Sequence, residues 1–172
     1  MISIPGYDQA TPTGKSKNEV FKAAESIAKH LRYKAGDELD SIVTELGGRI
    51  HYLNLHDWFS TQEASIWVHG ENHFDIFLSN FSSPLRNRFS IAHELGHYYL
   101  HSLEGKVKLI AARSGSHQTE WEANWFAAAF LMPEAEFKAA CKKYNEDMDY
   151  VAAHFLVSRK AADVRFNSIF GS

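Results

Sequence analysis

Two histidines four residues apart flank a glutamate in the segment His93-Glu94-Leu95-Gly96-His97, which has the pattern His-Glu-x-x-His. If this segment is helical, the two imidazoles differ by about 40° around the helix axis and lie one turn apart, so they can share a metal ion. Glu94 then points about 100° away from His93, where its carboxylate can accept a proton from a water molecule beside the metal. The pattern therefore predicts a hydrolytic metal site with Glu94 as the general base.

The residues around this pattern predict the helix that must position it, over residues 84–101. Ser83 and Pro84 form a helix start, because proline is well tolerated at the first helical position. Apolar residues then recur on one face and flank the pattern on both sides. The alternative, two surface histidines on an amphipathic helix, is less favoured, since this apolar setting would make unpartnered histidines and a buried glutamate costly.

A catalytic zinc ion usually has three protein ligands and one open position, so a third ligand must come from elsewhere in the chain. A second helix, expected over residues 118–131, carries Glu120 and Asn124 on one face at i and i+4. Glu120 is favoured as the third ligand over Glu122, which points about 200° away from it. A solvated helix face is the alternative for either glutamate. Asn124 would then hydrogen-bond a ligating histidine. The ligand set favours zinc, with manganese as the alternative.

The remaining periodicity predicts an α+β fold: a small antiparallel sheet of about three strands, surrounded by helices. The strands are expected over residues 49–55, 65–69 and 74–78, and the last two flank a hairpin turn at Gly70-Glu71-Asn72. Further helices are expected over residues 17–31, 37–46, 134–143, 149–155 and 158–169. Residues 1–16 are expected to be a flexible leader, and residues 17–172 a single metallopeptidase-like domain.

Composition narrows the functional class. The 172 residues fit one domain, and 18 lysines and arginines against 21 acidic residues leave a net charge of −3. This balance does not favour direct nucleic acid binding. A single cysteine excludes an internal disulfide framework and a cysteine-based zinc site. The sequence shows neither a signal peptide nor an apolar run of about 18 residues, so we expect a cytoplasmic protein without membrane association.

Two longer strings, RFSIAHELGHYYLH (residues 88–101) and EWEANWFAAAFLMP (residues 120–133), resemble the ImmA/IrrE family of metallopeptidases. The resemblance covers about residues 76–133 and implies a cytoplasmic zinc endopeptidase with a thermolysin-like active-site helix. It also implies a protein substrate, often a helix-turn-helix transcription repressor or a similar regulator. Carried over residue by residue, the family pattern makes His93, His97 and Glu120 the metal ligands and Glu94 the catalytic base. Asn124 agrees with the Glu-x-x-Ala-Asn pattern of that family.

Several alternatives stay open at this point. A binding module that regulates a transcription factor by docking, without cleaving it, would keep the same metal fold, although the intact Glu94 favours an enzyme. An additional donor to the oxyanion is expected, and its candidates are Tyr98, His101 and His117. The strand at residues 75–78 is either a sheet edge that pairs with an extended substrate or an ordinary paired strand.

Other side chains near the two motifs are read more simply as structural. The aromatic residues of the second helix are interpreted as core rather than as a substrate pocket: Trp121, Trp125, Phe126 and Phe130. Arg86 and Arg88, which precede the first motif, are interpreted as a solvated face rather than as residues that steer a substrate.

Overall fold

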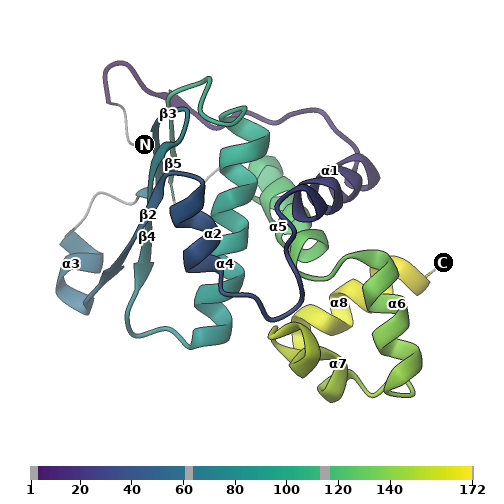
Figure 1. Cartoon of the computed structure of the whole chain (residues 1–172). Coiled ribbons are helices and arrows are strands. Elements are labelled where there is room, and N and C mark those ends of the chain that lie inside the picture. Colours follow the sequence, from purple (N-terminus) through teal and green to yellow (C-terminus); the bar gives the residue numbers. More distant parts are fainter. Residues whose placement is uncertain (1–3, 61–63, 113–116, 172) are drawn as a thin grey trace.

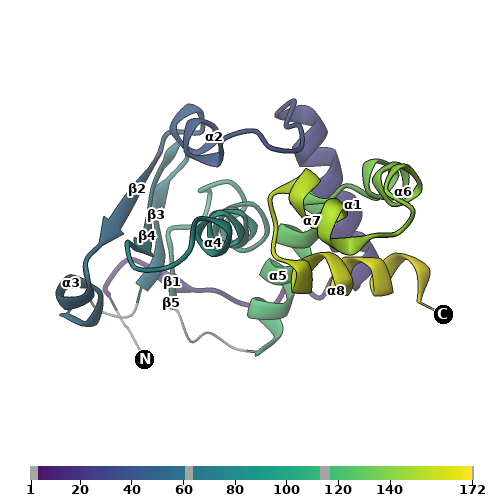
Figure 2. The same ribbon diagram turned by 90° about the horizontal axis from the view of Figure 1, so that it is seen from below.

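A computed structural model of the chain describes residues 4–60, 64–112 and 117–171. Helix α4 (Pro84–Gly96) lies against one face of a β-sheet, and α5 (His117–Leu131) and α1 (Lys17–His30) lie beyond α4. The last three helices form the part of the molecule farthest from the sheet (Figures 1 and 2). The fold is therefore α+β, as predicted, with α4 at its centre.

The sheet has five strands in the order β1-β5-β3-β4-β2. The strands are β1 (Asp8–Gln9), β2 (Gly48–Leu53), β3 (Ala64–Gly70), β4 (His73–Ser79) and β5 (Leu109–Ala112). The prediction of about three antiparallel strands is therefore not exact, because β2 pairs with β4 and β1 pairs with β5 in parallel. The two added strands have two and four residues, too few for an alternating pattern to be visible in the sequence.

The central hairpin of β3 and β4 agrees with the prediction and forms the floor on which α4 packs. Ile66 pairs with Ile76 and Val68 pairs with Phe74, and all four side chains are fully buried. Because β4 pairs on both sides, with β3 and with β2, it is not a sheet edge. The option that an extended substrate pairs with residues 75–78 is therefore wrong, and the alternative of an ordinary paired strand is confirmed.

The predicted helices are present, with ends that differ by one or two residues. Besides α1, α4 and α5, they are α2 (Leu39–Glu45), α6 (Glu134–Lys143), α7 (Met148–Phe155) and α8 (Arg159–Phe170). A short α3 (Leu55–Ser60) was not expected. Apart from α3, the helices stack on one side of the sheet (Figure 2), so the expectation that helices surround the sheet is wrong. No helix of the described residues combines the length and apolarity needed to cross a membrane.

The predicted helix over residues 84–101 changes character at its end. Ser83 caps α4 by accepting a hydrogen bond from the backbone N–H of Arg86, and Pro84 occupies the first turn. The last five residues form a π-helix, η1 (His97–His101). Because π-helical turns are wider than α-helical ones, residues 97 and 101 lie in altered positions relative to the axis of α4.

Gly96 sets how closely α4 and α5 approach each other. A Cβ atom at this position would lie 3.1 Å from the Cα atom of Ala123 and 3.1 Å from Cβ of Phe126. Only glycine leaves room for this contact without displacing one of the helices. The close approach matters because α5 carries Glu120, while α4 carries His93 and the adjoining η1 carries His97.

The C-terminal helices are tied to the rest of the fold through Arg165 of α8, which is 1% exposed. Its Nε atom donates to the carbonyl oxygen of Met132 at 3.0 Å, and its Nη2 donates to Glu25 at 2.8 Å. The guanidinium lies over the ring of Phe21, 4.5 Å from its centroid. This contact joins α8 to α1 and to the end of α5.

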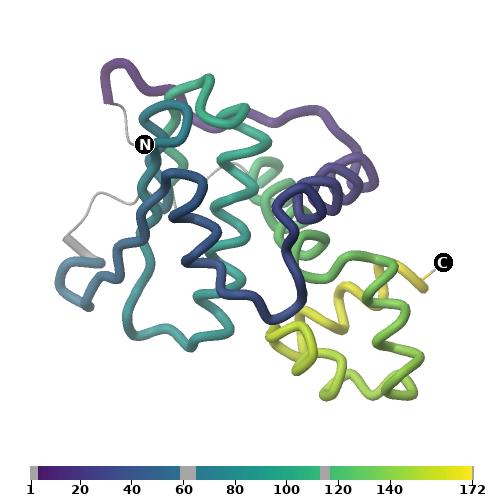
Figure 3. Tube along the Cα trace, in the orientation of Figure 1, coloured from purple at the N-terminus to yellow at the C-terminus, as the bar shows by residue number. Residues whose placement is uncertain are grey.

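The N-terminal segment crosses the molecule from the sheet to α1, as the purple trace in Figure 3 shows. Residues 8 and 9 pair with β5, and the backbone N–H of Thr13 donates to the carboxylate of Glu122 at 3.0 Å. The division into a flexible leader over residues 1–16 and a domain over residues 17–172 stays a prediction.

Candidate metal centre

His93 and His97 project from the same side of α4, as their spacing predicts. Their ring centroids are 5.0 Å apart, and the side chain of His97 is fully buried while that of His93 is 14% exposed. The hydrophobic face that buries Ile91, Ala92 and Leu95 against the sheet and α5 fixes the rotation of α4 about its axis. Both imidazoles are thereby directed toward the first turn of α5.

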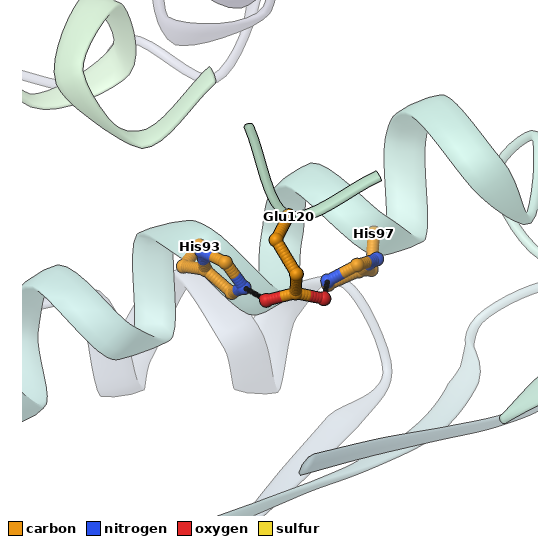
Figure 4. A group of neighbouring side chains, drawn as sticks. All are labelled: His93, His97 and Glu120. Atoms are coloured by element: carbon orange, nitrogen blue, oxygen red, sulfur yellow. Dashed lines mark ion pairs between the residues drawn. The ribbon is translucent and has the colours of Figure 1, made fainter. Parts of the chain in front are cut away.

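Glu120 in the first turn of α5 meets both imidazoles (Figure 4). One carboxylate oxygen lies 3.1 Å from Nε2 of His93, and the other lies 3.3 Å from Nε2 of His97. A ligand atom from each of the three residues lies within 4.8 Å of the other two. Two imidazoles and one carboxylate thus converge on one point, and such a set can hold a metal ion.

A bound metal ion would satisfy the polar atoms at this point better than their contacts with one another do. In the described part of the chain, Nε2 of His97 and Oε1 of Glu120 are buried without a hydrogen-bond partner. Buried polar atoms without partners are rare and costly, and a bound cation would satisfy both. Two neutral imidazoles and one carboxylate are also the donor set of many catalytic zinc sites.

The electrostatics hold Glu120 and His97 in the protonation states that a metal requires. Burial alone would raise the pKa of Glu120, but its contacts with His93 and His97 outweigh burial and lower the pKa to about 2. Burial lowers the pKa of His97 to about 4, despite the opposing effect of Glu120. Near neutral pH the carboxylate is therefore ionised and the His97 imidazole is neutral.

Asn124 orients His93. Its side-chain oxygen lies 2.9 Å from Nδ1 of His93, and an amide oxygen can only accept a hydrogen bond. The hydrogen of the neutral imidazole must therefore be on Nδ1, which leaves the lone pair of Nε2 directed toward Glu120. The amide lies one helical turn after Glu120 on α5, as the i, i+4 spacing predicts.

A second chain of hydrogen bonds, which sequence reasoning did not predict, orients His97. Its Nδ1 lies 2.9 Å from Nδ1 of His101, and Nε2 of His101 lies 3.0 Å from the carboxylate of Glu122. Glu122 in turn accepts the backbone N–H of Thr13 and the amide N–H of Gln118. The clue in the sequence was the third histidine at i+8 from His93, on the same face of the helix.

The three candidates for an additional oxyanion donor do not contact the centre in this role. Both ring nitrogens of His101 are engaged with His97 and Glu122. The Tyr98 hydroxyl donates to the carbonyl of Glu104 and accepts the N–H of Asn72, beside the hairpin turn. His117 is exposed at the start of α5, with its ring near Trp121.

Glu94 lies beside the three convergent residues and is 5% exposed. The hydroxyl of Ser65, on β3, lies 3.1 Å from its carboxylate and 3.2 Å from the carbonyl oxygen of Ala111. Glu94 lines a cavity of about 290 Å³ together with His93, Glu120 and Asn124. The cavity extends to the ends of α3 and β4, and it gives Glu94, His93 and Glu120 one common space.

The aromatic residues of α5 divide between two roles. Phe126 and Phe130 are fully buried core residues, as predicted. Trp121, in contrast, is 52% exposed, and Trp125 is partly buried, so the interpretation of Trp121 as core is wrong. One turn of helix separates the two tryptophans, and Trp125 packs against the edge of the core while Trp121 is directed to solvent.

Comparisons with known proteins indicate the family and the fold of the chain. The family profile described as the IrrE N-terminal-like domain, from a peptidase family, matches residues 44–167. No curated protein matches the chain. A solved structure named as a Mycobacterium tuberculosis transcriptional regulator superposes with a TM-score of 0.62 at 19% identity, over 88% of this chain and 48% of that one. The likeness shows a common fold, and this chain spans about half the length of the regulator.

Proposed function

The chain belongs to the family of IrrE N-terminal-like domains, and from that premise we propose that it is a zinc-dependent endopeptidase. In this proposal His93, His97 and Glu120 hold the metal, and manganese is the alternative to zinc. Glu94 is the general base, and Asn124 fixes the orientation of His93. The observation that carries the proposal is the convergence of three ligand atoms within 4.8 Å beside a buried glutamate.

In the proposed reaction, Glu94 carries out the proton transfers of peptide-bond hydrolysis. When bound, the metal supplies Lewis acidity, which polarises the scissile carbonyl and makes a water molecule more acidic. The Glu94 carboxylate removes a proton from that water, whose oxygen then bonds to the carbonyl carbon. As the C–N bond breaks, Glu94 returns the proton to the leaving amine. The products are a carboxylate and an amine, and Glu94 ends the cycle unprotonated.

The proposed substrate is a helix-turn-helix transcription repressor or a similar regulator. The family resemblance supports this choice, and the fold neighbour is itself named a transcriptional regulator. That name also supports the alternative: a domain of this fold that takes part in regulation by docking onto a transcription factor, with no cleavage. A buried general base next to the ligand residues favours the enzyme, because a docking module has no use for it.

Metal analysis and cleavage together test the proposal. Purified protein should contain one zinc per chain, and His93→Ala should remove it, whereas His56→Ala should not, since that side chain is 89% exposed and contacts Asp57 instead of the three ligand residues. A helix-turn-helix regulator encoded beside this chain is the substrate to assay. Glu94→Gln should keep the metal and slow cleavage by about 10²-fold or more.

Each outcome distinguishes the two functions. Cleavage that depends on both the metal and Glu94 supports the peptidase. If the Glu94→Gln variant inactivates the regulator as well as the wild type does, and the regulator is not cleaved, the docking function replaces the peptidase function. If the protein holds no stoichiometric metal and His93→Ala has no effect, neither function stands.

A further inference from the structure

A groove of about 890 Å³ runs beside the candidate metal centre, between α1, α4, α5 and α8. It adjoins the smaller cavity at the centre, because Arg86, Phe89, Ser90 and Asn124 line both spaces. Figure 2 shows α8 lying close to α5 on the side away from the sheet. A chain segment that crosses the metal centre can therefore continue into this groove.

The groove has an apolar surface exposed to solvent. Trp121, Leu85 and Val164 line it and are among the most exposed large apolar residues of the chain, with 52%, 40% and 56% of their surfaces accessible. Phe89 and Trp125 add partly buried aromatic rings. Exposed apolar residues that cluster in a concave surface typically mark a binding site.

The same groove is lined by basic side chains, although the whole chain has a net charge of −3. None of the described residues that line the groove is acidic. Four of them are basic: Lys17, Arg86, Lys160 and Arg165. Lys17, Arg86 and Lys160 are exposed. Arg165 is buried and paired with Glu25, but its Nη1 atom has no hydrogen-bond partner in the described part of the chain.

Helix dipoles add to this positive charge. Three helices of 12 or more residues, α1, α4 and α8, begin at the groove, where Lys17, Ser83 and Ser158 line it. The N-terminus of a helix carries a partial positive charge of about half a unit. Three such ends and three exposed basic side chains favour a negatively charged occupant.

We propose that this groove binds an acidic and apolar segment of the protein substrate, next to the bond that is cut. Apolar side chains of the substrate pack against Trp121 and Trp125, and its carboxylates lie near Lys17, Arg86 and Lys160. The proposal rests on the proposed peptidase function, since continuity with the metal centre is what makes the occupant a substrate. A single-stranded nucleic acid would also suit basic and aromatic side chains, but it would not place a peptide bond at the centre.

Peptide binding tests the proposal. The probe is a short fluorescent peptide with Phe-Leu at its centre and glutamates on both sides, and its counterpart has lysines in place of the glutamates. Binding is measured by fluorescence anisotropy at low ionic strength to zinc-loaded protein carrying Glu94→Gln, so that cleavage does not interfere. The acidic peptide should bind about tenfold or more tightly than the basic one.

Charge reversal in the groove supplies the matched variants. Lys17→Glu and Lys160→Glu should each weaken binding of the acidic peptide by about threefold to tenfold and strengthen binding of the basic one. Lys142→Glu makes the same change of charge on the exposed face of α6 and should alter neither affinity. All three residues are exposed, so the variants are expected to fold normally.

The outcomes separate this proposal from the peptidase function. Equal binding of the two peptides, or no effect of Lys17→Glu and Lys160→Glu, overturns the groove proposal even if a regulator is cut. Tighter, salt-sensitive binding of a thymidine oligonucleotide than of the acidic peptide assigns the groove to nucleic acid and also overturns it. Selective binding of the acidic peptide without cleavage of any regulator supports an acidic and apolar ligand for the groove, but it overturns the peptidase function and with it the assignment of that ligand as a substrate.

Discussion

Nδ1 of His97 lies 2.9 Å from Nδ1 of His101, so one imidazole orients another at the candidate metal centre. The Glu122 carboxylate can only accept, so Nε2 of His101 carries a hydrogen. Burial lowers the pKa of His101, which favours its neutral form, and its Nδ1 is then an acceptor. The hydrogen of neutral His97 must therefore be on Nδ1, and its Nε2 lone pair points toward Glu120.

This chain of hydrogen bonds predicts that His101 and Glu122, which do not contact the metal, affect the affinity of the centre for zinc. His101→Ala should weaken zinc binding by about 10–100-fold, as measured by competition with a chelating dye. Glu122→Ala should weaken it by a similar factor, and the double variant should lose little more than either single one, because both act through His97. His56→Ala is the control and should bind zinc like the wild type. Additive losses in the double variant would show that the two residues act separately.

Ser65 is expected to affect the rate of cleavage without affecting metal content. Its hydroxyl lies 3.1 Å from the Glu94 carboxylate. Ser65→Ala removes a contact that helps to orient the carboxylate, so kcat should fall by about tenfold while KM and zinc content stay constant. Ser41→Ala, at an exposed position of α2, is the control. A change in KM alone would assign Ser65 to substrate binding.

Gly96→Ala should push α4 and α5 apart and thereby lower the affinity of the candidate metal centre for zinc. The new Cβ would lie 3.1 Å from Cα of Ala123, and this backbone atom can move only with α5, which carries Glu120. We expect a loss of about 1–3 kcal/mol in the free energy of unfolding of the metal-free protein, as well as weaker zinc binding. Gly70→Ala is the control, because nothing lies within 4 Å of the position of its Cβ. Unchanged stability and zinc affinity would mean that α5 adjusts freely.

The local signals of the sequence were sufficient to predict most helices and the central hairpin. The capping box of Ser16 and Glu19 is present at the start of α1, and α6 spans the predicted residues 134–143. The parallel pairing of β2 with β4 could not be predicted in this way. Register between distant strands depends on packing of the whole chain, which no local pattern records.

The candidate site shows the same limit. The spacing of His93 and His97, and of Glu120 and Asn124, predicts which side chains share a helix face, and these four residues meet in the structure. The spacing does not reveal which faces of different elements meet. Ser65 from β3 and Thr13 from the N-terminal segment reach the centre only through tertiary packing. The π-helical turn that brings His101 to His97 also breaks the regular helical period.

Asp75 on β4 is expected to make the free energy of unfolding decrease when the pH becomes acidic. Partial burial would raise its pKa, but hydrogen bonds with His51 and His69 and the charge of Arg49 outweigh burial and lower it. A carboxyl group with a lowered pKa in the folded state stabilises that state fully above its unfolded pKa of about 3.9. This stabilisation is lost as the pH falls through the lower, folded-state value.

Asp75→Asn cannot ionise and should therefore lack this contribution at every pH. Urea unfolding should show the variant to be less stable than the wild type by about 1–3 kcal/mol near neutral pH, and this difference should shrink as the pH falls below about 4. Asp163→Asn, which removes only an exposed ion pair with Arg159, should change stability by less than about 1 kcal/mol. The wild type and the two variants have the same candidate metal ligands. Protonation of those ligands therefore changes the stability of all three proteins equally and does not affect the differences. A difference that stays constant into acid would mean that Asp75 stabilises the sheet through its shape and packing and not through its charge.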